Sequence, residues 1–107
     1  MAAATKEEIE KLALQFQVRC LNMHRKLFFD LQERDISPEI KDRAAQLIRY
    51  TKTGQYAEAK KETDDIAYLF TTLFKIHYLE PPVYKSVAVD AAVLSEEFSQ
   101  ILAENEE

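Results

Sequence analysis

The chain has 107 residues, of which 47% are apolar and 31% charged, with one glycine, three prolines and a formal net charge of −5. This balance fits one helical globular domain and excludes a disordered segment. The single cysteine, Cys20, excludes an internal disulfide, and no stretch resembles a signal peptide or approaches the roughly 18 apolar residues of a membrane span. We therefore expect an intracellular protein, cytoplasmic or nuclear, without membrane insertion.

The charges are unevenly distributed along the chain. Residues 1–61 carry 12 basic and 9 acidic side chains, a net +3, whereas residues 62–107 carry 2 and 10, a net −8. The pattern predicts a molecule with one mildly basic and one acidic part.

A first helix is predicted from the capping box Thr5-Lys6-Glu7-Glu8, in which Thr5 and Glu8 satisfy each other's backbone amides. An apolar stripe at intervals of three and four then runs for roughly 26 residues. It comprises Ile9, Leu12, Phe16, Cys20, Met23, Leu27 and Leu31, and is broadened by Leu14, Val18, Leu21 and Phe28. So wide a stripe needs more than one neighbouring helix to cover it.

Two further helices are marked by start and stop signals. Ser37-Pro38 predicts a helix capped by Ser37, and Gly54, the only glycine, predicts its end. A third helix is expected from Tyr56 to Leu79, where Pro81-Pro82 forces a stop. The sequence does not settle whether it is continuous through residues 62–65.

A fourth helix follows the double proline, with a seam at Tyr84, Val87, Ala91, Leu94, Phe98 and Ile101. The short linkers between these helices favour antiparallel neighbours. The fold class predicted is therefore all-α, a four- to five-helix antiparallel bundle in a single domain over residues 1–107, with disorder confined to residues 1–4 and 104–107.

The sequence contains few residues that could catalyse a reaction or bind a metal ion. His24 and His77 have no Cys, His or carboxylate at metal-ligand spacing on the same face, and we expect exposed or rim histidines. A phosphotransfer role for His24 is disfavoured by its bulky neighbours. Cys20 is expected to be a buried, inert thiol. The cluster Glu62, Asp64 and Asp65 lacks calcium-loop spacing and is expected to be a solvated face. We expect no enzyme activity, cofactor or metal.

The stretch Leu27–Ile66 combines a helix, a short linker into Ser37-Pro38, a second helix, and the turn Gly54-Gln55-Tyr56 followed by small residues. In this pattern it resembles the C-terminal helical domain shared by the steroid receptor RNA activator protein and the large outer-coat subunit of COPII vesicles. The resemblance implies a non-enzymatic bundle that acts through protein contacts, in vesicle coating or transcriptional co-regulation. It implies no catalytic residue.

The aromatic side chains suggest the leading function, a protein–protein interaction module that serves as an adaptor, scaffold or assembly subunit. Six Phe and five Tyr exceed what a small four-helix core buries tidily, and aromatic anchors dominate interface energetics. The candidate partner-binding residues are Phe28, Phe29, Tyr68, Phe70, Phe74, Tyr78 and Tyr84. The competing interpretation is that all of them belong to the core.

Two other partners stay open. An RNA-associated role would use a basic patch on the first three helices, formed by Arg19, Arg25, Lys26, Arg43, Arg49 and Lys52. The interspersed acidic residues and the negative total weaken that interpretation. Self-association through the seam of the fourth helix is the other. The sequence identifies neither the partner nor the oligomeric state.

Overall fold

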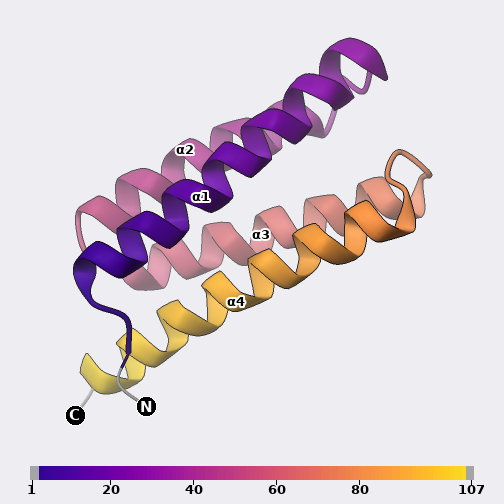
Figure 1. Ribbon diagram of the computed structural model, residues 1–107. Coiled ribbons are helices and arrows are strands. Elements are labelled where there is room, and N and C mark those ends of the chain that lie inside the picture. The colour runs from indigo at the N-terminus through magenta and orange to yellow at the C-terminus, as the bar shows by residue number, and fades with distance from the viewer. Residues whose placement is uncertain (1–2, 106–107) are drawn as a thin grey trace.

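Four α-helices joined by short connections make up the part of the chain that the computed structural model describes, residues 3–105. They are α1 (Lys6–Arg25), α2 (Ser37–Lys52), α3 (Tyr56–Lys75) and α4 (Pro81–Asn105), and a π-helix, η1 (Lys26–Asp30), continues α1. Consecutive helices run antiparallel (Figure 1). The predicted all-α bundle is confirmed, and α3 is continuous through residues 62–65.

The start of α1 follows the predicted capping box. Thr5 Oγ1 accepts a hydrogen bond from the Glu8 amide at 3.2 Å, and the Glu8 carboxylate accepts one from the Thr5 amide at 3.1 Å. At the other end, Leu31 N donates to Lys26 O, five residues back, which widens the last turn into η1. The predicted long first helix is therefore present, with a π-helical end.

The start of α2 differs from the prediction that Ser37 caps it. Ser37 is the first helical residue, and its hydroxyl donates to Glu33 O at 2.8 Å. The buried Glu33 carboxylate instead accepts from the amides of Asp35, Ile36 and Ser37, the last at 2.6 Å. Glu33 reaches these amides because the connection after η1 folds back on itself. A sequence rule for helix caps considers only the residue next to the helix start, so it does not predict this cap.

The ends of α2 and α3 share one geometry. Gly54 at the end of α2 has φ +74°, and Gln55 N donates to Tyr50 O at 2.9 Å, so the predicted glycine stop is confirmed. His77 takes the equivalent place after α3, with φ +70°, and Tyr78 N donates to Leu73 O at 2.9 Å. The prediction that the third helix reaches Leu79 is wrong, because this left-handed residue ends it at Lys75 before the prolines are reached.

The core is formed by one face of each helix. Ile9, Ala13, Phe16, Cys20 and Leu27 come from α1 and η1, Ile40, Ala44 and Leu47 from α2, Ala59, Ile66, Phe70 and Leu73 from α3, and Val87, Ala91, Leu94, Phe98 and Ile101 from α4. Each large apolar side chain buried in this way stabilises the fold by about 1.5–3 kcal/mol. The seam predicted for α4 is confirmed as a core face, so it is not free to pair with a second copy.

The chain ends are tied together. Ala3 and Ala4 pack against the core, and the Ala3 amide donates to the Glu104 carboxylate at 3.0 Å. The disorder that the sequence predicts for residues 1–4 and 104–107 stays a prediction; the contacts above are those of Ala3, Ala4 and Glu104 in the folded arrangement. Residues 1–2 and 106–107 lie outside the described part of the chain.

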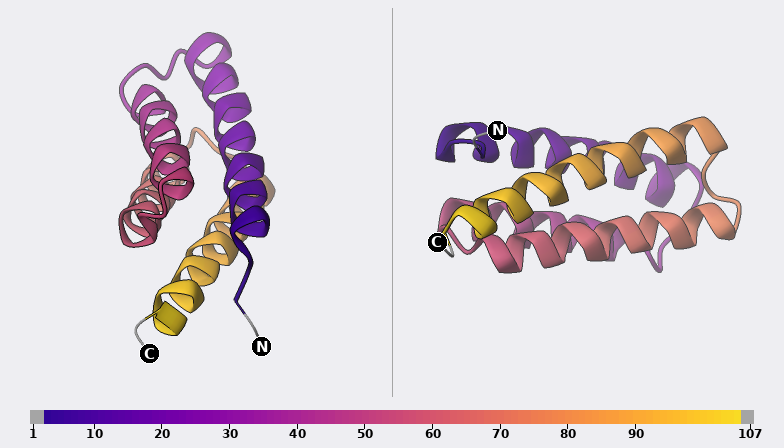
Figure 2. Two further views of the ribbon diagram at one scale, coloured as in Figure 1. Left: turned by 90° about the vertical axis from the view of Figure 1, so that its left-hand side faces the viewer. Right: turned by 90° about the horizontal axis from the view of Figure 1, so that it is seen from below.

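The helices pack in the order α1, α2, α3, α4, and α1 contacts α4 less extensively than it contacts α2. Figure 1 shows the end of α1 and the α3–α4 connection at one end of the bundle, where the two hairpins spread apart; Figure 2 gives the same arrangement from two other sides. We call this the open end. Within residues 3–105, no helix is both long enough and apolar enough to cross a bilayer.

Candidate functional site

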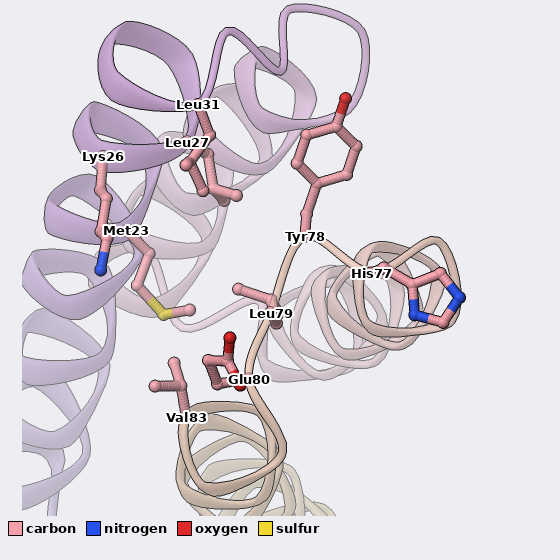
Figure 3. Close-up of a pocket in the computed structure, with 9 residues that line it drawn as sticks. All are labelled: Met23, Lys26, Leu27, Leu31, His77, Tyr78, Leu79, Glu80 and Val83. Atoms are coloured by element: carbon pink, nitrogen blue, oxygen red, sulfur yellow. The ribbon is translucent and has the colours of Figure 1, made fainter.

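A cleft of about 430 Å³ lies at the open end of the bundle. Its lining comes from α1 and η1 on one side and from the α3–α4 connection and first turn of α4 on the other. The residues are Met23, Lys26, Leu27 and Leu31, then His77, Tyr78, Leu79, Glu80 and Val83. Figure 3 shows Met23, Leu79 and Val83 pointing toward one another, whereas His77 points away. We call these three apolar side chains the floor of the cleft; Val83 also reaches its mouth, and Glu80 lies beside Leu79 and Val83 in this view.

Unusual backbone surrounds this cleft. The π-helix η1 carries Lys26 and Leu27 into its wall, and Gln32 just beyond has φ +55°. His77, with φ +70°, begins the opposite wall. Left-handed residues other than glycine and π-helical turns are uncommon, and both gather at functional sites. Their coincidence with the cleft marks the open end as the candidate site.

The mouth of the cleft offers apolar contact with charge at its edges. Leu31 and Val83 are 43% and 39% exposed, so both can meet an incoming side chain. Lys26 and Glu80 are exposed on the lining, and within residues 3–105 neither forms an ion pair. The arrangement suits an apolar group that carries polar atoms on either side.

The predicted aromatic residues do not form one surface. Tyr78 lines the cleft. Phe74 and Tyr84 stack on each other with ring centroids 4.3 Å apart, and the Tyr84 hydroxyl shares a hydrogen bond with Thr71 Oγ1 at 2.9 Å. This pair holds α3 to α4 rather than projecting into solvent.

Two aromatic residues of α3 have opposite environments. Phe70 is 1% exposed, so its prediction as part of an exposed surface is wrong: it is buried in the core. Tyr68 is 71% exposed and makes no aromatic contact within residues 3–105. A single exposed tyrosine of this kind is common on protein surfaces.

The second predicted aromatic patch lies on η1. The half-buried Phe28 ring packs against His24 at 5.3 Å and against Phe29 at 4.9 Å, between ring centroids. The Arg34 guanidinium lies 4.8 Å above the Phe28 ring, a cation–π contact. Phe29 is 64% exposed and is available to a partner.

The predicted basic patch is partly neutralised. Arg19 pairs with Asp90 of α4. Arg43 pairs with Glu39, Glu62 and Asp65 at 3.0–3.3 Å. Slight burial lowers the pKa of Arg43, but the Glu39 hydrogen bond and the carboxylates around it outweigh that effect and raise it. The remaining members, Arg25, Lys26, Arg49 and Lys52, are exposed and form no ion pair in the described chain.

The carboxylates of the acidic cluster of α3 form ion pairs with lysine and arginine side chains of the same chain. Asp64 pairs with Lys60 at 2.8 Å and accepts a hydrogen bond from Ser95, and Asp65 pairs with both Arg43 and Lys61. Within residues 3–105 no group of three His, Cys, Asp or Glu side chains is arranged to hold a metal ion.

Cys20 and His24 both lie in the bundle. The prediction that Cys20 is buried is confirmed. Burial raises the pKa of its thiol to about 12, with nearby Arg19 offsetting part of the effect, which favours the unreactive protonated form. The prediction of an exposed or rim position for His24 is wrong, because its ring packs beside Phe28 and is buried. Among the described residues, His24 Nδ1 finds no hydrogen-bond partner.

Sequence reasoning missed the cleft because its residues were assigned to other roles. Met23 and Leu31 belong to the predicted core stripe of the first helix, and Leu79 to the predicted end of the third. The sequence signal that could have found it is the length of the apolar stripe of the first helix, which extends to Leu31.

The comparisons with known proteins identify the fold. No family model matches the chain, and no curated protein matches it. A crystal structure of a protein of unknown function from the S23 ribosomal protein family of Bacteroides thetaiotaomicron is similar, with a TM-score of 0.87 at 17% sequence identity. The match covers 92% of this chain and 97% of that one. At this identity the likeness shows the four-helix architecture and does not assign a function.

Proposed function

We propose that this chain is a non-enzymatic protein–protein interaction module, an adaptor, scaffold or assembly subunit. The observation that supports the proposal is the cleft at the open end, where Met23, Leu79 and Val83 form an apolar floor open to solvent. These apolar side chains are exposed to water in the free chain. When a partner's apolar side chain packs against them, apolar surface is removed from water on both proteins, which favours binding.

The cleft also has features that select among partners. An aliphatic or aromatic side chain fits the floor, while Tyr78 offers an aromatic wall. Lys26 at the edge binds a carboxylate of the partner, and Glu80 binds a basic group or an exposed amide. The expected partner segment therefore presents one apolar anchor between polar neighbours.

The setting of this interaction is part of the proposal. The unpaired, buried thiol of Cys20 supports an intracellular compartment, cytoplasmic or nuclear. Vesicle coating and transcriptional co-regulation, the two settings implied by the resemblance of Leu27–Ile66, remain proposals that rest on that resemblance.

The test is affinity capture from cell lysate with matched variants. Leu31→Glu and Val83→Glu each place a charge at the mouth of the cleft, and Val89→Glu places the same charge on the outer face of α4, at a position 60% exposed. We expect wild type and Val89→Glu to capture a specific protein partner, and the two cleft variants to lose it. Circular dichroism is used to check that all four proteins are folded. Equal capture by all four proteins would contradict the proposal.

An RNA-associated role is the second candidate. Arg49 and Lys52 near the end of α2 support it, because both are exposed and form no ion pair in the described part of the chain. The ion pairs of Arg19 and Arg43 count against a larger patch. The double charge reversal Arg49→Glu, Lys52→Glu removes this site without breaking an ion pair. Recovery of RNA by wild type and not by this variant would favour the second candidate over the first.

A further inference from the structure

The α1 helix has a second apolar stripe on the side away from the core. Leu14, Val18 and Leu21 recur at intervals of four and three, and Phe29 of η1 continues the line two turns further on. Leu14, Val18 and Phe29 are 52%, 48% and 64% exposed, so the folded chain leaves this stripe uncovered. Apolar residues at helical spacing on an exposed face are typical of a surface that another helix covers.

Two hollows lie along this stripe, both between α1 and α2. One, of about 330 Å³, is lined by Leu14, Ile48 and Lys52 among others. The other, of about 420 Å³, is lined by Val18, Leu21 and Phe29 together with Lys41. Along α1 the two hollows extend from the level of Lys11 to that of Phe29, about 27 Å at 1.5 Å per residue. Five turns of helix have that length. We call the two hollows and the exposed stripe between them the groove.

Four cationic side chains line the groove. Lys11 and Lys52 line the first hollow, and Arg25 and Lys41 line the second. None of the four forms an ion pair within residues 3–105, in contrast to Arg19 and Arg43.

The two ends of the groove differ in charge. Glu7 and Glu10 border the first hollow, beside Lys11 and Lys52, whereas the lining of the second has Arg25 and Lys41 and no acidic residue. The unbalanced positive charge of the lining is therefore at the end nearest η1.

We propose that this groove binds an acidic amphipathic helix of another protein, about five turns long. Its apolar stripe packs against Leu14, Val18 and Phe29, and its carboxylates pair with Arg25 and Lys41. The charges argue for this occupant: Arg25 and Lys41, which form no ion pair within residues 3–105, lie beside the apolar Val18, Leu21 and Phe29 in a lining without an acidic residue. The surface is separate from the cleft at the open end, because it lies on the opposite side of α1.

Other occupants fit less well. A nucleic acid would gain little from Leu14 and Val18, whereas a helix can pack its apolar stripe against both. A bilayer binds a helix whose apolar face can lie in the membrane interface, whereas the apolar residues of this site border hollows between two helices.

The probe is a synthetic 18-residue helical peptide with leucines at intervals of three and four and glutamates on both flanks. Two matched peptides replace every glutamate by glutamine or by lysine. Fluorescence anisotropy is expected to show binding of the acidic peptide that weakens with salt, and no measurable binding of the lysine peptide. Equal binding of the acidic and glutamine peptides would overturn the proposal.

Variants locate the site. The double reversal Arg25→Glu, Lys41→Glu is expected to weaken the acidic peptide at least about tenfold, because two attractions become repulsions. Val18→Glu should have a similar effect. The matched reversal Lys75→Glu, Lys85→Glu, which makes the same change in net charge elsewhere, should leave binding within about twofold. If both double variants lost affinity for the acidic peptide to a similar extent, the loss would follow from net charge alone, and the proposal would be overturned.

The same proteins also test whether a second copy of this chain covers the groove. Analytical ultracentrifugation of wild type, Val18→Glu and Val89→Glu reports self-association through the groove. A wild-type oligomer that dissociates in Val18→Glu would show that another copy of this chain covers the groove, and would contradict the proposal. Preferential binding of single-stranded RNA or anionic vesicles over the acidic peptide would contradict it as well.

Discussion

Phe74 and Tyr84 stack with an angle of 6° between their ring planes, and this contact joins the end of α3 to the start of α4. Phe74→Ala is expected to destabilise the fold by about 2 kcal/mol through lost packing and stacking. Tyr84→Phe keeps the stack and loses only the hydrogen bond to Thr71, so it should cost about 1 kcal/mol. Urea unfolding measures both. If Phe74→Ala left the free energy of unfolding unchanged, the ring would not hold α3 to α4, and it could serve as a docking residue as the sequence suggests.

The Glu33 carboxylate replaces the serine cap that the sequence predicts for α2. Glu33→Ala leaves the amides of Ile36 and Ser37 without their acceptor, so we expect a loss of about 1–3 kcal/mol in the free energy of unfolding. Glu33→Gln retains an acceptor oxygen and should lose less. The comparison with Ser37→Ala is decisive: if the serine variant lost more than Glu33→Ala, the carboxylate would not be the main cap.

His77 is in a left-handed conformation that an L-residue adopts at a cost, whereas Gly54 holds the same position after α2 without one. His77→Gly is expected to raise the free energy of unfolding by about 0.5–1 kcal/mol. Gly54→Ala should lower it by about 1 kcal/mol, through backbone strain alone, because an added Cβ would meet no atom within 4 Å. Thermal unfolding monitored at 222 nm gives the sign of each change, and a destabilised His77→Gly would contradict the assignment.

Local signals predicted most of the helices because caps and periodicity act over a few residues. The Thr5 capping box, the Gly54 stop and the α4 seam all depend on near neighbours, and all three are present. The same rules could not separate Phe70 from Tyr68, since both lie in a run that is apolar on nearly every side. Only the positions of the other three helices decide which ring is buried.

The candidate site was less predictable for a related reason. The cleft exists because two hairpins spread apart at the open end, and that angle depends on packing along the whole bundle rather than on any one segment. The reach of Glu33 to Ser37 and the left-handed His77 likewise depend on how the connections fold. Tyr78 was selected from composition, and the structure places it in the cleft wall.

Cys20 provides a pH-dependent test of the core. Because burial raises the pKa of the folded thiol from its usual 9.0 to about 12, the folded chain keeps its proton when the unfolded chain loses it. The thiol's contribution to stability is therefore fully present below about pH 9 and is lost as the pH rises toward 12. Wild type should lose stability over this range relative to Cys20→Ala. Parallel pH profiles for the two proteins would show that the thiol is not shielded.

The central claim is that the cleft at the open end docks a protein partner. The most direct measurement places a photo-crosslinking amino acid at Leu31, Val83 or Val89 and irradiates intact cells. The account predicts the same protein adduct from Leu31 and Val83, on opposite walls of the cleft, and none from Val89 on the outer face of α4. Adducts that are identical from all three positions, or adducts with RNA alone, would contradict it.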